Sequence, residues 1–427
     1  MYKYLILFIL VAPLLGIIFM EGGEYGWSIG LEGHANGASI AYIVYAIVVV
    51  VFAYLGGMRW KSDAAFPEAQ PAKLEAQYRP YIAGVVVVEC LLLAILLFVF
   101  DGFRVWTGEI NKGIFRSNLG TFGSFVFVST KFLIPGLLAY GACLYLQVER
   151  NGVNRVLWWA ACVVAFVCGS TWGFKSTSMF MLLPSLLIIF WHITLRQAVL
   201  VGLAVLGSLV GFSFLFDESV YGANVFEFLW FRATVLQGDV GWLVWEQFVH
   251  GEKFPSYGWT LLPFMGDNIF TATTGIDRSQ TILWSEYHYD YMLNFIAGRP
   301  YFESGEGGSI VGTVFSEGLI AGGIPGLIIF GALAGILIGR IFRHLNRAMA
   351  EGRNIRVALL STYFCSVILV WMNGGGIIQL FHIAIVGGML AIYLAIMILN
   401  GGATRNVGRA LRYNPSWLPQ RHPRSLL

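Results

Sequence analysis

The sequence predicts an all-α fold: a polytopic membrane helix bundle with about ten transmembrane helices and one large external loop. Its 427 residues are 57% hydrophobic and only 12% charged, whereas an average soluble domain is about 25% charged. The apolar residues gather in segments of about 20, the length of a membrane-spanning helix. Lysine and arginine are concentrated on one side of those segments. This composition excludes an ordinary soluble protein, a nucleic-acid binder and a disordered chain.

Ten segments have the length and hydropathy of spans, or nearly so. In chain order they are 4–20, 38–58, 81–100, 122–146, 156–173, 177–194, 197–216, 310–339, 357–372 and 376–399. The first follows Met1-Tyr2-Lys3 and has no small-residue cleavage site before Glu21, so we expect a retained helix rather than a signal peptide.

The segment 310–339 is too long for one simple span. Gly322, Gly323 and Pro325 interrupt it, and glycine and proline break helices inside a membrane only where the freed backbone groups find other partners. We therefore expect a partial or re-entrant helix followed by a full span.

The charges predict the orientation and the domain organisation. With both termini in the cytoplasm, 18 of the 27 lysines and arginines lie in cytoplasmic segments, together with five of the 24 acids. Positive residues favour the cytoplasmic side. The expected organisation is transmembrane helices 1–7 in residues 1–215, a large external loop in 216–309, and helices 8–10 with a basic cytoplasmic tail in 310–427.

The large loop carries the residues expected to do chemistry. It holds 21 aromatic residues and 12 acids but only four bases. Aromatic faces beside carboxylates suit sugar rings, and the sugar-binding candidates are Trp242, Trp245, Trp284 and Tyr287. The alternative is an interfacial aromatic belt together with packing inside the loop. That alternative leaves the accompanying acids unexplained.

Arg232, Asp239 and Glu246 recur every seven residues in a stretch with a helical pattern, 223–251. They would share one helix face, either as a solvated charge row or with Arg232 binding an anion, because its planar donor fork matches phosphate oxygens. A second basic group, Arg104, Lys112 and Arg116, lies in the short external loop 101–121.

Two ionisable residues lie inside expected spans. Glu89 is at mid-span and Lys131 is about two turns inside the next span, and such groups usually face a partner or a cavity. We expect a Glu89–Lys131 ion pair. Lys175, in a tight external turn, would place a cation at the membrane surface or extend to the interface as a snorkelling lysine.

The external histidines are His34, His250 and His288. His288 stands between Glu286 and Asp290, where it could serve as a general base or have a structural role. All five cysteines lie in apolar segments, and the sequence has no P-loop and no HExxH motif. We therefore expect no metal, no cofactor and no nucleotide-driven activity.

Three stretches resemble a known family. They are the turn from Gly169 to Ser176, the arginine at 232 with the following Gln237-Gly238, and the run from Gly307 to Gly326. Together with the topology they resemble the bacterial oligosaccharide repeat-unit polymerases, the Wzy-type O-antigen polymerases, which share architecture with O-antigen ligases. Lys175 stands where that family usually has arginine, which keeps the charge but not the bidentate geometry.

The resemblance implies a GT-C-like, inverting glycosyltransferase on the periplasmic face of the bacterial inner membrane. Its substrates would be undecaprenyl-diphosphate-linked oligosaccharides, with a flippase and a chain-length regulator as possible protein partners. A leaving diphosphate needs fixed cations, and the candidates are Arg232, Lys175, Arg116, Arg278 and Arg299. The attacking sugar hydroxyl needs a base, and the candidates are Glu317, His288 and Asp239.

Three other functions stay open at the level of sequence. An O-antigen ligase would share the carrier and the topology. A flippase or transporter of a lipid-linked sugar would place charges along a path through the bundle. A non-catalytic secretion subunit would tolerate loss of any single external arginine.

Overall fold

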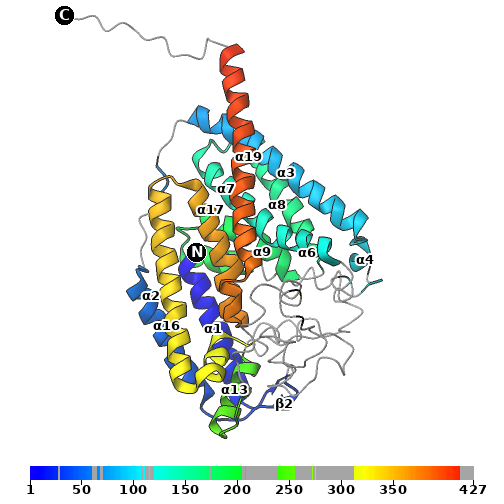
Figure 1. The fold of residues 1–427 in the computed structure, drawn as a ribbon. Coiled ribbons are helices and arrows are strands. Elements are labelled where there is room, and N and C mark those ends of the chain that lie inside the picture. Colours follow the sequence, from blue (N-terminus) through cyan, green and yellow to red (C-terminus); the bar gives the residue numbers. More distant parts are fainter. Residues whose placement is uncertain are drawn as a thin grey trace, which may run out of the picture.

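The computed structural model is an all-α helical bundle, which confirms the expected fold class (Figure 1). It describes residues 1–26, 29–59, 65–67, 71–107, 109–110, 115, 120–172, 175–203, 207, 238–254, 272, 275 and 312–413. Within these residues, eight helices are long and apolar enough to cross a membrane. The one sheet found in the described part pairs two short strands, β1 Tyr25–Gly26 and β2 Leu31–Glu32.

The elements follow one another with short connections. The helices before the large loop are α1 Tyr2–Glu21, α2 Ala38–Gly56, α3 Pro71–Ala94, α4 Phe103–Trp106, α6 Gly120–Val128, α7 Ile134–Gln147, α8 Gly152–Ser170 and α9 Lys175–Ile189. Later helices are α13 Asp239–Val249, α16 Val314–Ala350, α17 Asn354–Tyr363, α18 Leu369–Gly374 and α19 Ile383–Tyr413. Wider π-helical turns, η1 Ile95–Val99, η2 Ser129–Leu133 and η8 Phe364–Ile368, and the 3₁₀ turn η9 Ile377–Leu380 complete the set.

Eight of the ten expected spans coincide with these long helices. The expected span at 177–194 corresponds to the shorter apolar helix Ser178–Ile189 within α9. The expected span at 197–216 is described only to residue 203 and at 207. The protein is therefore a multi-pass membrane protein by the length and composition of its helices, as the sequence predicted.

Helices α2 and α16, far apart in sequence, lie side by side (Figure 1). Gly331, Gly335 and Gly339 place a strip of missing side chains on α16 every four residues. A Cβ atom on Gly335 would overlap the carbonyl oxygen of Val49, and one on Gly339 would overlap that of Ala53. Small residues at this spacing let two membrane helices approach to backbone contact.

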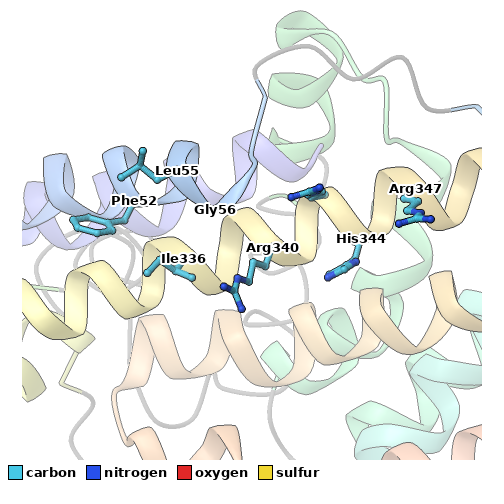
Figure 2. Close-up of a pocket in the computed structure, with 8 residues that line it drawn as sticks. Phe52, Leu55, Gly56, Ile336, Arg340, His344 and Arg347 are labelled. Carbon is cyan, nitrogen blue, oxygen red and sulfur yellow. The ribbon is translucent and has the colours of Figure 1, made fainter.

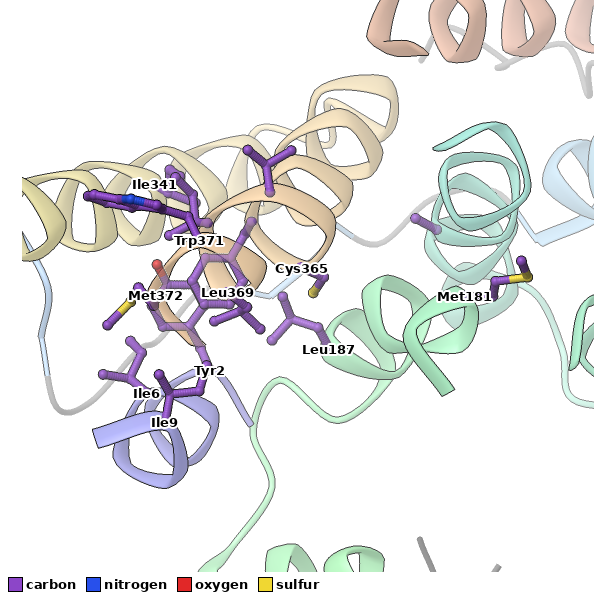
Figure 3. Packing of buried hydrophobic residues seen from close by; sticks show 14 of the residues in the cluster. Tyr2, Ile6, Ile9, Met181, Leu187, Ile341, Cys365, Leu369, Trp371 and Met372 are labelled. Carbon is purple, nitrogen blue, oxygen red and sulfur yellow. The ribbon is translucent and has the colours of Figure 1, made fainter. Parts of the chain in front are cut away.

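The core of the bundle is aromatic around Tyr2. Its hydroxyl donates to the carbonyl of Ile338 at 2.7 Å, and its ring stacks on Phe364 with 4.2 Å between ring centroids. Trp371, Leu369 and Cys365 belong to the same buried cluster (Figure 3). The first turn of α1 is thus held against α16 and α18, which fixes the N-terminal helix inside the bundle.

Helix α16 is broken where the sequence predicted. Gly323 has φ 61° and ψ −144°, a conformation that only glycine adopts without strain. The short arm before the break, residues 314–321, folds against the long arm, residues 324–350, so closely that a Cβ on Gly326 would overlap the carbonyl oxygen of Gly318. The helical break is confirmed, and its result is a hairpin of two packed arms.

The expected Glu89–Lys131 ion pair was wrong. Glu89 is fully buried, and neither of its carboxylate oxygens has a hydrogen-bond partner in the described part of the chain. Its backbone carbonyl accepts from the thiol of Cys168 on α8, whereas Lys131 lies in η2, which packs on α19, with its ammonium 5.7 Å from the Phe132 ring centroid. The two side chains belong to different helix interfaces.

Candidate functional site

Helix α13 comes from the large loop and sits at one end of the bundle. Gly238, just before it, contacts α1 so closely that a Cβ would overlap Ile17, and Gly241 faces Ile17 and Phe315. Phe248 lies beside Gly323 at the break of α16. We call the region formed by α13, residues 33–37 and the short arm of α16 the α13 end of the bundle (Figure 1).

Glu246 is the centre of a polar cluster at the α13 end. Its Oε1 lies 3.0 Å from Nε2 of His34 and 3.3 Å from Nδ1 of His250, and its Oε2 accepts from the amide of Asn36 at 2.7 Å. The Glu246 side chain is 16% exposed, while those of His34 and His250 are 58% and 65% exposed. A largely covered carboxylate therefore holds two solvent-facing imidazoles.

Two indoles fix the backbone that carries His34. The N–H of Trp242 donates to the carbonyl of His34 at 3.0 Å, and the N–H of Trp245 donates to that of Asn36 at 3.1 Å. The His34 ring also meets Trp242 edge-on at 5.1 Å between centroids. Trp242 is 1% exposed, which leaves no open face for the sugar stacking expected of it, and Trp245 is partly buried against Phe248.

Asp239 lies at the start of α13 and is fully buried. Its Oδ1 accepts from the backbone N–H of Val240 at 2.7 Å. A carboxylate in the first turn of a helix is stabilised by the free N–H groups and the dipole there. This position gives Asp239 a capping role and no surface from which to reach a substrate in this conformation.

Glu317, on the short arm of α16, is also fully buried. Its Oε2 accepts from the indole of Trp371 at 2.8 Å and from the N–H of Gly376 at 3.0 Å, and its Oε1 accepts from the N–H of Ile377 at 2.6 Å. Gly375 and Gly376 have positive φ angles of 72° and 84°, which turns their backbone toward the carboxylate. Glu317 therefore ties the short arm to the turn between α18 and η9.

The remaining predicted site residues are not placed. Lys175 begins α9, but its side chain lies outside the described residues. So do the predicted diphosphate, base and sugar candidates Arg116, Arg232, Arg278, Arg299, His288, Trp284 and Tyr287. Of the predicted set, the structure brings Asp239, Trp242 and Trp245 together on one helix, and places Glu317 on the short arm that packs against it.

The cluster around Glu246 includes residues that sequence reasoning did not combine. Glu246 and His250 are four residues apart, so helical periodicity alone places them on one face. His34 and Asn36 precede Glu246 by 212 and 210 positions, and no local pattern connects them. The remaining signal is the pair of tryptophans three residues apart, which carries two side-chain donors to a buried helix face.

A histidine held by a carboxylate can accept a proton from a hydroxyl group while the carboxylate orients the imidazole. Within the described residues, no group of three His, Cys, Asp or Glu side chains is arranged to hold a metal ion. No protein-family model, curated protein or solved structure matches this chain.

Proposed function

We propose that this chain is an integral membrane glycosyltransferase that polymerises undecaprenyl-diphosphate-linked oligosaccharide repeat units on the periplasmic face of the bacterial inner membrane. The observation that carries the proposal is the exposed His34–Glu246 pair at the α13 end of a membrane helix bundle, 3.0 Å apart. It stands on a helix from the acid-rich and aromatic-rich loop, where the sequence predicted glycan chemistry.

In the proposed reaction, a hydroxyl of the acceptor sugar attacks the anomeric carbon of the donor glycan. The new glycosidic C–O bond forms as the bond to the diphosphate breaks, and the configuration at that carbon inverts. The hydroxyl proton passes to Nε2 of His34, which Glu246 orients. The lipid diphosphate departs with the electron pair, stabilised by cations for which Arg232, Lys175, Arg116, Arg278 and Arg299 are the proposed set.

This assignment changes the order of the candidate bases. Asp239 and Glu317 are fully buried and their oxygens accept hydrogen bonds within the protein, whereas a base must reach the substrate hydroxyl. His34 is exposed and is oriented by a carboxylate. His288 stays a second candidate by its sequence position.

The direct test uses purified protein and a lipid-linked repeat unit without any nucleotide sugar. Lengthening of the glycan on its carrier, seen as a ladder on a gel, is the expected result. In cells, deleting the gene should remove the long-chain ladder and retain a single repeat unit. Transfer of finished glycan to lipid A-core, with lipid-linked polymer accumulating in the deletion strain, would replace polymerase by ligase.

Glu89 favours one alternative, a flippase or transporter of a lipid-linked oligosaccharide. A carboxyl group without a hydrogen-bond partner among the described residues, inside an expected span, is typical of a translocation path. Movement of a labelled lipid-linked sugar across proteoliposomes that contain only this protein, lost in Glu89→Gln, would support transport over polymerisation.

A further inference from the structure

A second polar site lies between the last turns of α2 and the long arm of α16. It is a cavity of about 540 Å³ with one basic wall and one apolar wall (Figure 2). The basic wall is formed by Arg340, Arg343 and Arg347, and the apolar wall by Phe52, Leu55 and Ile336. Residues 324 to 347 of the long arm span about 35 Å at 1.5 Å per residue, so this cavity is remote from the α13 end.

The arginines share a helix face because they are three and four residues apart. Arg347 donates to Glu351 at 2.7 Å, and Arg353 contacts the same carboxylate at 2.9 Å. In the described part of the chain, this is the one acid found in an ion pair beside the cavity. Arg340 and Arg343 are exposed and make no ion pair with any described residue. The cavity therefore has an unbalanced positive wall.

His344 also lines the cavity and contacts Arg356, with its Nδ1 3.4 Å from a guanidinium nitrogen. Five basic residues of α16 and α17 thus surround a space that contains no protein anion. Like charges so close together repel one another, and a bound anion would relieve that repulsion. An arginine presents a fork of N–H donors that matches phosphate oxygens in pairs.

The apolar wall indicates which kind of phosphate fits. Leu55 is 74% exposed beside Phe52 at the end of α2, and both α2 and α16 are candidate membrane spans. The stem of Arg343 lies against Gly57, so the arginine reaches from the apolar surface toward the head-group level. A soluble phosphate needs no apolar wall, whereas an acyl chain does. Arginines that only marked the cytoplasmic side would need no cavity.

We propose that this cavity binds an anionic phospholipid. Arg340 and Arg343 bind the phosphate oxygens of the head group, and the acyl chain lies along Phe52, Leu55 and Ile336. The site is separate from the proposed transfer reaction and does not depend on it. Basic pockets between membrane helices are suited to anionic head groups.

The test measures binding of short-chain phosphatidylglycerol to the full-length protein in detergent, by native mass spectrometry. Replacing both arginines, R340Q with R343Q, should weaken binding about tenfold or more, because two charge-assisted contacts are lost. The matched control is R150Q with R155Q, which removes two exposed arginines away from the cavity, and it should stay within about twofold of the unchanged protein. Equal loss in both double variants, or no loss in the first, would overturn the site.

Two further arms separate the lipid from other ligands. Leu55→Ser should weaken phosphatidylglycerol binding, because it removes part of the acyl-chain wall at a position that is already exposed and tolerant of change. Phosphatidylcholine should bind at least about tenfold more weakly than phosphatidylglycerol. Displacement of the lipid by inorganic phosphate at equal concentration would show a soluble-anion site and overturn the lipid assignment. Circular dichroism of each variant checks that the fold is retained.

Discussion

The two ends of α16 hold polar groups in opposite ways. At the α13 end, Glu246 is matched by His34, Asn36 and His250, and the short arm is tied by Glu317 to three donors. At the other end, arginines line a cavity with one carboxylate beside them. The first region satisfies its charges internally, so it holds a fixed geometry. The second leaves charge unsatisfied, which suits a ligand that the protein does not contain.

The largest effect is expected from breaking the fixed end at Glu317. Glu317→Ala leaves the indole of Trp371 and the N–H groups of Gly376 and Ile377 buried without an acceptor. Each unsatisfied donor costs about 1–3 kcal/mol, so a loss of about 3 kcal/mol or more in the free energy of unfolding is expected. Thermal unfolding in detergent measures it. Glu317→Gln keeps one carbonyl acceptor and should lose less, and equal melting of Glu317→Ala and the unchanged protein would contradict the tie.

The next effect concerns activity at the same end. Under the proposed function, His34→Ala should slow repeat-unit lengthening about 100-fold, the usual contribution of a general base, without unfolding the exposed site. The initial rate of glycan lengthening by purified protein measures this.

His250→Ala is the matched control for that experiment. His250 contacts the same carboxylate, but its Nδ1 also lies 2.9 Å from the carbonyl of Glu246 in its own helix, and the variant should keep most of the activity. Equal rates in the two variants would remove the special role assigned to His34.

A smaller effect is expected where α2 meets α16, between the two ends. Gly335→Ala places a Cβ against the backbone of Val49, and overpacking of this kind costs about 1–3 kcal/mol. It should also widen the groove and weaken lipid binding in the mass-spectrometric assay. Gly387→Ala, on α19 where a Cβ meets nothing within 4 Å, is the control and should leave both stability and binding unchanged.

The smallest effect is expected at Glu89. Its carboxylate oxygens have no hydrogen-bond partner among the described residues, and a buried charge without a partner destabilises the folded state. Glu89→Gln removes the charge at the same volume, so the unfolding temperature should stay the same or rise. A clear drop in that temperature would reveal a partner for the carboxylate in the folded protein.

Prediction from sequence worked where the property is local. Hydropathy over about 20 residues located eight spans, and glycines 322 and 323 located the break in α16. It worked less well where a side chain had to be assigned a partner. Glu317 was proposed as a base, but its carboxylate accepts from residues 54 to 60 positions away. Trp242 was proposed to bind sugar, but it is buried and holds His34.

The sequence by itself determined that this chain is a bundle of membrane helices, where one helix breaks, and that arginines share a face of α16. These follow from hydropathy, from the φ angles open to glycine, and from the period of a helix. Only the tertiary structure decided that His34 meets Glu246 and that Glu89 does not meet Lys131. Those contacts depend on how each helix is rotated about its own axis, and that rotation is set by packing with neighbours distant in the chain.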